Sequence, residues 1–523
     1  MFQIAQDHRA LLIMLASAAA CYTYFPLQLQ SMEAYSYAAA IEKYYDLSAT
    51  FALAQGEYLP DFGRYHPNHP LGHAIAGLVF DWLKIPALAW LRFTNITSTL
   101  AAAVFIYMIA LHLRYSKSIA TLAVGLFLGT FSTLMVVFSG EWHMVSLALS
   151  LAATREIFLY VPSGEKRRLH RGAAFLCVAV CYHTVALSYS VCLAVLLLLL
   201  RKKYWRDLLV AGGSAAAVII FTYFILPFFI FHFTSVSDFL RTFFMYGHLG
   251  HTRYGVIDWL LVAIQTLFHS FVYIPPSLPA MNWFGIPFFM GIILATWYFF
   301  RSKVDLAVKL LFLFMLVGWP AALAIVGTRA NGMNGYLFLL PILCLVLARI
   351  MFNLPQRIWF IRAVVVAFIC AWNFYYVIFP NYAYKRDDVF LFKLPETVPK
   401  ATPVAFVVGE LVLTIGEIWH AGSALDFRNQ TTFYPCCGED NYEFRLRRWL
   451  RANPGGIVVT DSDTLVTQPY LQAQGLSHLR WLDRSVSWPA ALLPATLYFK
   501  RDPGYRYRKR LIIWLPAERI PPT

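Results

Sequence analysis

Apolar residues along this chain are gathered into long runs that few charged residues interrupt. A helix needs about 20 mostly apolar residues to cross the hydrocarbon core of a bilayer, which is about 30 Å thick. Runs of this kind are found at residues 10–27, 92–112, 118–138, 142–160, 207–231, 282–300, 306–327, 335–351 and 361–379. The pattern therefore predicts an all-α polytopic membrane domain over residues 1–380.

The run from 172 to 200 is longer than one crossing requires and shorter than two ordinary crossings need. Clusters of basic residues flank it at both ends. A pair of short helices that turns near His183 and Thr184 accounts for both features. With this pair, the chain is predicted to cross the membrane about eleven times.

Basic residues follow alternate connections between the apolar runs, as expected when the loops that carry them face the cytoplasm. The predicted inner segments contain Arg9, Arg114, Lys117, Lys166, Arg167, Arg168, Arg171, Arg201, Lys202, Lys203, Arg206, Arg301, Lys303, Lys309, Arg349, Arg357 and Arg362. The predicted outer loops contain fewer basic residues, namely Lys43, Arg64, Lys84, Arg241, Arg253 and Arg329. We therefore expect a multi-pass protein of a bacterial inner membrane, with a cytoplasmic N-terminus and the C-terminal part in the periplasm or outside the cell.

Two of the predicted outer loops, 28–91 and 232–281, are long. Each contains an amphipathic or apolar stretch, 71–83 in the first loop and 256–273 in the second. We expect these stretches to lie in the plane of the membrane interface and not to cross, because a crossing at 256–273 would move the basic residues after the next run to the outer side.

The composition changes to that of a soluble domain in residues 381–523. A helical pattern at 442–452 precedes a strand-like run at 457–460. Asp502-Pro503-Gly504 separates two further strand-like runs, 496–499 and the stretch that ends at Trp514, and this spacing predicts a β-hairpin. We predict a small α/β domain on the extracytoplasmic side.

The overall composition agrees with a membrane protein, since 59% of residues are hydrophobic, 14% are charged and the mean hydropathy is +0.57. The net charge of +15 reflects membrane topology and not a nucleic-acid partner, because the basic residues follow the inner connections. The spacing of the eight cysteines indicates neither a disulfide framework nor a zinc site. The redox state of the adjacent Cys436 and Cys437 stays open.

Residues with chemical potential gather in the first predicted outer loop. Glu33 lies just after the first apolar run, and Tyr65-His66-Pro67-Asn68-His69-Pro70-Leu71-Gly72-His73 precedes the amphipathic stretch. This arrangement resembles the GT-C superfamily of membrane glycosyltransferases, which use polyprenyl-phosphate sugars and include the protein O-mannosyltransferases and lipid A aminoarabinose transferases. The paired short helices at 172–200 and the segment 335–341 are similar to the same superfamily. The chain departs from its usual pattern at Glu33, where Asp is common, at Leu71, where Pro is common, and at His183, where Lys is frequent.

The resemblance implies transfer of a sugar from a polyprenyl-phosphate donor to an extracytoplasmic glycan, lipid or protein acceptor, with inversion at the anomeric carbon. Glu33 is the predicted catalytic base, because partial desolvation at the membrane interface favours a carboxylate that takes up a proton. The secondary acid or metal candidates are Glu57, Asp61, Glu141, His66, His69 and His143. The candidate ligands of the donor phosphate are Arg241, Arg253 and Arg329, since arginine binds phosphate in bidentate fashion. A divalent metal ion is a possible cofactor, because imidazole and carboxylate together suit zinc or manganese.

Other functions fit the same pattern. A lipid-linked polysaccharide ligase would depend on His248, His251, Arg241 and Arg253 in the second outer loop. A lipid flippase or solute transporter would also use many helices, although the scarcity of charges within the apolar runs argues against proton coupling. A scaffold or assembly factor with a degenerate site is the remaining alternative.

Overall fold

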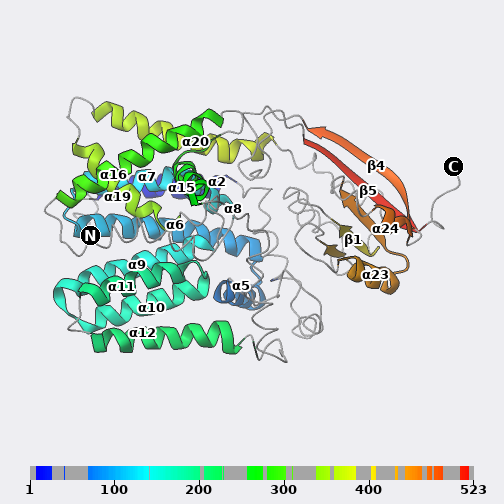
Figure 1. Ribbon diagram of the computed structural model, residues 1–523, viewed down its shortest axis with the longest axis horizontal. Coiled ribbons are helices and arrows are strands. Elements are labelled where there is room, and N and C mark those ends of the chain that lie inside the picture. The colour runs from blue at the N-terminus through cyan, green and yellow to red at the C-terminus, as the bar shows by residue number, and fades with distance from the viewer. Residues whose placement is uncertain are drawn as a thin grey trace.

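The computed structural model contains a bundle of helices followed by a mixed β-sheet (Figure 1). We refer to these as the helical part, which ends at Ala383, and the sheet part, which begins at Val404. The structure describes residues 8–25, 41, 69–139, 142–200, 205–226, 228, 256–274, 279–301, 309, 337–353, 359–383, 402–407, 430–433, 442–461, 468–473, 476–486 and 507–516.

The helices of the first half of the chain coincide with the apolar runs of the sequence. They are α2 (Arg9–Tyr24), α5 (Pro70–Leu83), α6 (Ala87–His112), α7 (Lys117–Gly129), α8 (Phe131–Ser139), α9 (His143–Ser163), α10 (Lys166–Tyr182), α11 (Ala186–Leu200) and α12 (Trp205–Ile220), which continues as a π-helical turn (Phe221–Ile225). The predicted turn at His183 and Thr184 is confirmed, because it separates α10 from α11.

The second half of the helical part is described in separate pieces. They are α15 (Val256–Phe271), a 3₁₀ segment (Pro279–Phe284), α16 (Gly285–Arg301), α19 (Leu340–Asn353) and α20 (Trp359–Ala383). The run predicted at 306–327 lies outside the described residues, apart from Lys309.

Several described helices have the length and apolar character of membrane spans. Within the described residues, α6, α9 and α12 with its π-helical turn meet both conditions, and a fourth span is obtained if α7 and α8 are counted as one. Shorter apolar helices of 10–17 residues lie within α2, α16, α19 and α20. The chain is therefore a multi-pass membrane protein, and the total of about eleven crossings stays a prediction.

The span predicted at 118–138 is divided into two helices, because α7 and α8 meet at an angle of 55°. Thr130 between them has an extended backbone (φ −66°, ψ 147°), which ends α7. Its hydroxyl donates to the carbonyl of Phe127 at 2.9 Å and contacts the hydroxyl of Thr133 at 2.8 Å. These local bonds give the backbone a partner outside the helical pattern, so hydropathy alone does not reveal the bend.

A buried asparagine on α20 stabilises the same bend. The Asn373 amide group donates to the carbonyls of Gly129 at 2.8 Å and Phe271 at 2.6 Å, and its oxygen accepts the backbone N–H of Tyr273 at 2.8 Å. Asn373 is fully buried. One side chain thus joins the end of α7 to the end of α15.

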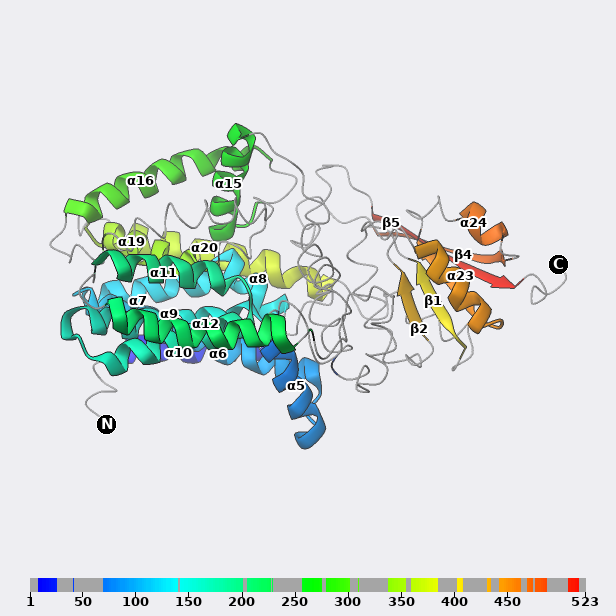
Figure 2. The same cartoon turned by 60° about the horizontal axis from the view of Figure 1, so that its bottom comes forward.

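Two helices lie across the general direction of the bundle. Figure 2 shows α15 at a steep angle to α16, beside the end of α16 that is nearer to the sheet part, and α5 projecting from the end of α6 and α10 that is nearer to the sheet part. The outer side of α5 is apolar and exposed at Leu78, Trp82 and Leu83. Both orientations agree with the interfacial positions expected for residues 71–83 and 256–273.

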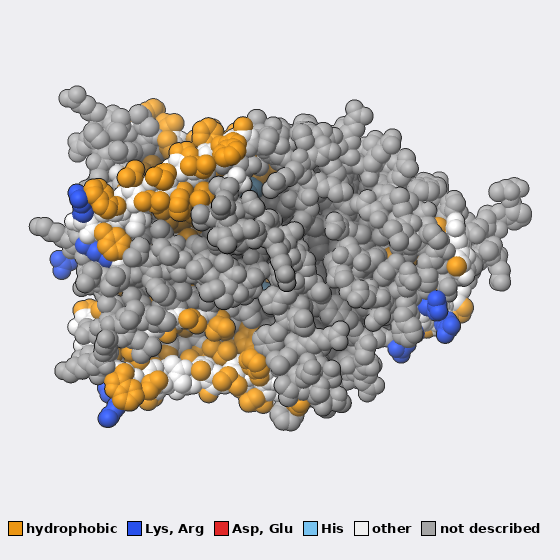
Figure 3. All heavy atoms as spheres, viewed as in Figure 1, with side chains coloured by type: hydrophobic (Ala, Val, Ile, Leu, Met, Phe, Trp, Pro, Cys, Tyr) orange, Lys and Arg blue, Asp and Glu red, His pale blue; other side chains and the backbone are white. Residues whose placement is uncertain are grey.

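The helical part has a basic end, which is the end away from the sheet part. Figure 3 shows exposed hydrophobic side chains over the helices and Lys and Arg side chains at this end. The Arg349 guanidinium lies 5.3 Å from the Tyr115 ring, and the Lys166 ammonium contacts the Asp207 carboxylate at 2.9 Å. The basic residues of separate connections therefore gather on one side, as the charge pattern of the sequence predicts.

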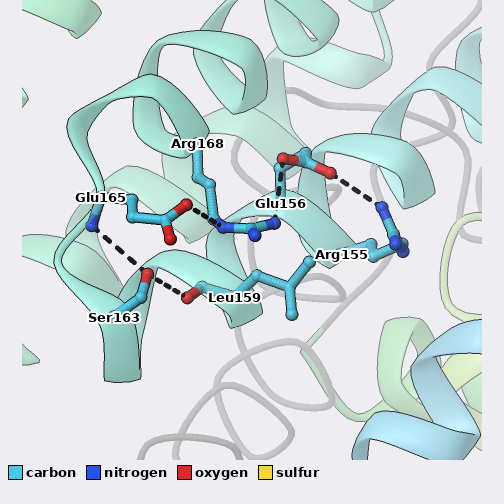
Figure 4. Close-up of polar contacts among 6 residues, drawn as sticks. All are labelled: Arg155, Glu156, Leu159, Ser163, Glu165 and Arg168. Carbon is cyan, nitrogen blue, oxygen red and sulfur yellow. Dashed lines mark hydrogen bonds and ion pairs between the residues drawn. The ribbon is translucent and has the colours of Figure 1, made fainter.

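Ion pairs join α9 to α10 at the basic end (Figure 4). Glu156, which is 6% exposed, bonds Arg155 at 2.8 Å and contacts Arg168 at 3.8 Å. Arg168 also bonds Glu165 at 2.6 Å. The buried Glu156 is thus compensated by arginines from two helices.

The sheet part contains five strands in the order β2-β1-β3-β5-β4. Their bounds, with those of two helices, are β1 (Val404–Val407), β2 (Gln430–Phe433), α23 (Tyr442–Ala452), β3 (Ile457–Asp461), α24 (Gln468–Ala473), β4 (Leu476–Val486) and β5 (Tyr507–Pro516). Strands β2, β1 and β3 are parallel, whereas β5 is antiparallel to both β3 and β4.

The hairpin predicted around Asp502-Pro503-Gly504 stays a prediction, and the described strands give β5 two other neighbours. Throughout its length β5 pairs with β4, from Leu476 opposite Pro516 to Val486 opposite Tyr507. The predicted partner strand, 496–499, and the turn itself lie outside the described residues. A turn signal in the sequence identifies a local reversal, but it does not select among strands that are further away along the chain.

Candidate functional site

Four buried histidines meet at the end of the helical part that is nearer to the sheet part. His69 and His73 lie one helical turn apart at the start of α5, His143 begins α9, and His183 lies between α10 and α11. Their exposed fractions are between 0% and 7%. We call these four residues the histidine cluster.

His183 is the centre of the histidine cluster. Its ring centroid lies 3.8 Å from that of His143 and 4.4 Å from that of His69. The His73 ring stacks on the His69 ring, with 6.4 Å between the two ring centroids. Three separate segments of the chain therefore contribute imidazoles to one buried position.

A hydrogen bond from the backbone selects the tautomer of the neutral His183 ring. Its Nδ1 atom accepts the backbone N–H of Val185 at 3.0 Å, so the proton of the neutral ring is on Nε2. The backbone N–H of His183 donates to Ala179 at 2.9 Å, which ends α10. The turn thus holds an Nε2–H donor in fixed orientation within the cluster.

A fully buried tryptophan packs next to the histidine cluster. Trp142 precedes His143 and packs in a small apolar core with Ala76, Ala87 and Leu91. A Cβ atom at Gly72 would lie 2.9 Å from the Trp142 ring, so this close packing of α5 requires glycine. Among the described residues, the Trp142 indole N–H has no acceptor, which gives the site a buried donor.

An arginine positions the helix that leads to the predicted base. The Arg92 guanidinium on α6 donates to the carbonyls of Tyr22, Thr23 and Phe25 at the end of α2. Carbonyls at a helix C-terminus have no partner within the helix, and a cation there also complements the helix dipole. The Tyr22 hydroxyl adds a bond to Leu128 at 3.0 Å. The exit of α2 is therefore fixed beside α6 and α7.

The histidine cluster suits proton transfer or the binding of an anion. Neutral imidazoles offer both donors and acceptors, and a proton taken up by one ring disfavours protonation of its neighbours. The rings pack against one another, with His183 nearest to His143 and His69. The described residues contain no group of three His, Cys, Asp or Glu side chains placed to hold a metal ion.

The predicted residues divide into two groups. The structure brings together His69 and His143, with a centroid separation of 6.5 Å. The other predicted residues lie outside the described residues, namely Glu33, Glu57, Asp61, His66, Glu141, Arg241, Arg253 and Arg329. Their roles stay predictions.

The importance of His183 was not apparent from the sequence, which assigned it to a turn without a chemical role. A signal was present, because α10 begins at one basic cluster and α11 ends at another, so the turn between them is expected on the same side as the outer loops. Trp142 and Arg92 were likewise absent from the predicted site. Neither Trp142 nor Arg92 belongs to a recognisable sequence motif, since each contacts parts of the chain that are distant in sequence.

Comparisons with known proteins address the fold. No protein-family model matches the chain, and no curated protein sequence matches it at a significant level. The chain is similar in structure to ArnT from Cupriavidus metallidurans bound to undecaprenyl phosphate, with a TM-score of 0.57 and 12% sequence identity. The match covers 98% of this chain and 99% of ArnT, and the apo form of ArnT gives a TM-score of 0.55. An oligosaccharyltransferase from Archaeoglobus fulgidus matches with a TM-score of 0.46, too low to support an argument.

The chain therefore shares its overall fold with ArnT, and the resemblance stated from the sequence is confirmed for the fold. ArnT is a lipid A aminoarabinose transferase, and this chain has the same architecture along nearly its whole length. At 12% identity the similarity describes the fold and not the substrate.

Proposed function

We propose that this protein transfers a sugar from a polyprenyl-phosphate carrier to an extracytoplasmic acceptor. The observation that carries the proposal is the buried histidine cluster at one end of a fold shared with ArnT over 98% of the chain. ArnT has been solved with undecaprenyl phosphate bound, so the same fold accommodates a lipid-linked phosphate in that protein.

In the proposed reaction, the Glu33 carboxylate takes the proton from an acceptor hydroxyl. The acceptor oxygen then attacks the anomeric carbon, and the bond between that carbon and the phosphate oxygen breaks. The electron pair leaves with the polyprenyl phosphate, and attack from the opposite face inverts the anomeric centre. Donors directed at the oxygen on which negative charge develops lower the barrier.

Within the described residues, His183 and Trp142 are suited to this stabilising role. The Nε2–H of His183 is held in orientation by the bond from Val185 to Nδ1, and the Trp142 indole N–H has no acceptor in the described part of the chain. Arg241, Arg253 and Arg329 are proposed to hold the phosphate as well.

The test is mass spectrometry of the purified full-length protein incubated with a panel of polyprenyl-phosphate sugars and membrane extract as the acceptor source. Release of free polyprenyl phosphate together with a glycosylated product is expected. Glu33→Gln should reduce this release at least about hundredfold, because a general base contributes about 10²–10⁴ to the rate. Glu165→Gln, an exposed carboxylate at the basic end, serves as the matched control and should retain activity.

Two results would contradict the proposal. If wild-type protein moves the lipid-linked sugar across vesicles without forming a glycosidic bond, the chain is a transporter. If Glu33→Gln keeps full activity while Arg253→Ala abolishes it, the reaction follows the ligase alternative and the assignment of the base is wrong.

A further inference from the structure

The first turns of α10 carry a concentration of positive charge that helix stability does not explain. Lys166, Arg167, Arg168, His170 and Arg171 all lie near the helix N-terminus, and the first turn contains no acidic residue. Cations at this end oppose the helix dipole, which costs about 0.3–1 kcal/mol for each exposed charge. The arrangement therefore calls for an interaction outside the helix.

The acidic groups around this turn are engaged with other cations. Asp207 contacts Lys166, whereas Glu165 contacts Arg168. Glu156 contacts Arg155 and, at longer range, Arg168 (Figure 4). These pairs join α10 to α9 and α12. They do not account for Arg167, His170 and Arg171, whose side chains are exposed.

Arg167 and Arg171 lie on the same helix face as an exposed apolar surface. Arg167, Arg171, Ala174 and Val178 follow the spacing of four, three and four residues that places side chains on one face of a helix. All four are exposed, and Val178 is 37% exposed. We call this stripe the arginine face. It presents charge at the end of the helix and hydrocarbon further along.

Tryptophans mark the depth of the membrane interface at the same end. Trp205 begins α12, whose first turn is joined to α10 by the bond between Lys166 and Asp207. Trp205 is 49% exposed and lies 5.5 Å from the Arg206 guanidinium. Trp297 is 55% exposed, and the Arg301 guanidinium lies 3.7 Å from the centroid of its ring. Exposed tryptophan is enriched at the level of lipid headgroups, so the arginine face lies at that level too.

We propose that the arginine face binds an anionic phospholipid of the adjacent leaflet. The headgroup phosphate contacts Arg167 and Arg171, with His170 beside them, and the acyl chains follow Ala174 and Val178. This inference concerns the end opposite to the histidine cluster and does not depend on the proposed function.

Native mass spectrometry of the full-length protein in a neutral detergent tests this site, with phosphatidylglycerol titrated against phosphatidylcholine. Wild-type protein is expected to bind phosphatidylglycerol preferentially. Arg167→Gln/Arg171→Gln should weaken this binding about thirtyfold, since each basic residue near a membrane surface contributes about fivefold. Arg447→Gln/Arg451→Gln on α23 removes two arginines of the same spacing from another exposed helix and should leave the binding unchanged.

Competition distinguishes a lipid from a free phosphate. Glycerol phosphate has the charged group without acyl chains and should not displace phosphatidylglycerol at equal concentration. Displacement by glycerol phosphate would overturn the proposal, as would equal losses of lipid from the α10 variant and the α23 control. Gel filtration confirms that both variants remain folded.

Discussion

The two ends of the helical part use polar residues in opposite ways. At the basic end, full charges are numerous, and those that approach the interior are compensated by partners from neighbouring helices, as Glu156 is by Arg155 and Arg168. At the other end, the described interior contains imidazoles, an indole and an amide in place of full charges. Groups that are neutral near physiological pH can be buried without permanent partners and can still exchange a proton. This difference underlies the two proposals, which assign lipid contact to the charged end and chemistry to the end with the histidine cluster.

The largest effect that would test this division is expected at His183. His183→Ala should reduce kcat/KM about hundredfold, because it removes an oriented donor from the developing negative charge. His183→Lys should recover part of this loss by restoring a donor. His170→Ala is the control and should remain active. His170 is an exposed histidine on α10, the helix that ends before His183, but it lies at the basic end. Equal activity of His183→Ala and wild type in a transfer assay would remove the cluster from the mechanism.

A smaller effect is expected from Gly72→Ala. The new Cβ would lie 2.9 Å from the buried Trp142 ring and must displace it, which should cost about 2 kcal/mol of stability. Gly212→Ala on α12 provides the comparison, because a Cβ there meets nothing within 4 Å and alanine favours helix. Thermal unfolding in detergent measures both. A neutral result for Gly72→Ala would show that α5 does not pack as closely against Trp142 as described.

The smallest effect is expected at the basic end. Glu156→Gln should lower the free energy of unfolding by about 1 kcal/mol, since it leaves two half-exposed arginines without their shared counter-charge. Catalytic activity should stay within about twofold of wild type, because the change is far from any reacting group. A loss of transfer activity in a variant that unfolds like wild type would contradict the separation of roles between the two ends.

The helices were largely predictable because membrane spans are selected by one dominant property. The run at 92–112 became α6 and the run at 142–160 became α9, with ends displaced by a few residues. The turn at His183 followed from length and flanking charge. The bend at Thr130 was not predictable, since the bonds of its hydroxyl and the support from Asn373 do not alter hydropathy.

The site was predictable in its chemical type and less so in its members. His69 and His143 were selected because they lie in predicted outer segments, and the structure brings both to His183. His183 itself was treated as part of a turn, because its role depends on contact between residues more than a hundred positions apart in the chain. The pairing of β5 with β4 is likewise a contact between segments separated along the chain, which the sequence pattern does not reveal.

The bonds of Asn373 have a consequence for synthesis in the membrane. Asn373 is synthesised 244 residues after Gly129 and about 100 residues after Phe271 and Tyr273. The backbone groups of these three residues therefore receive their partner late. At about 5–20 residues per second, the carbonyl of Gly129 waits roughly ten seconds or more for its partner. A nascent chain that stops before α20 thus lacks the partner of the Gly129 carbonyl and of the backbone groups at the end of α15.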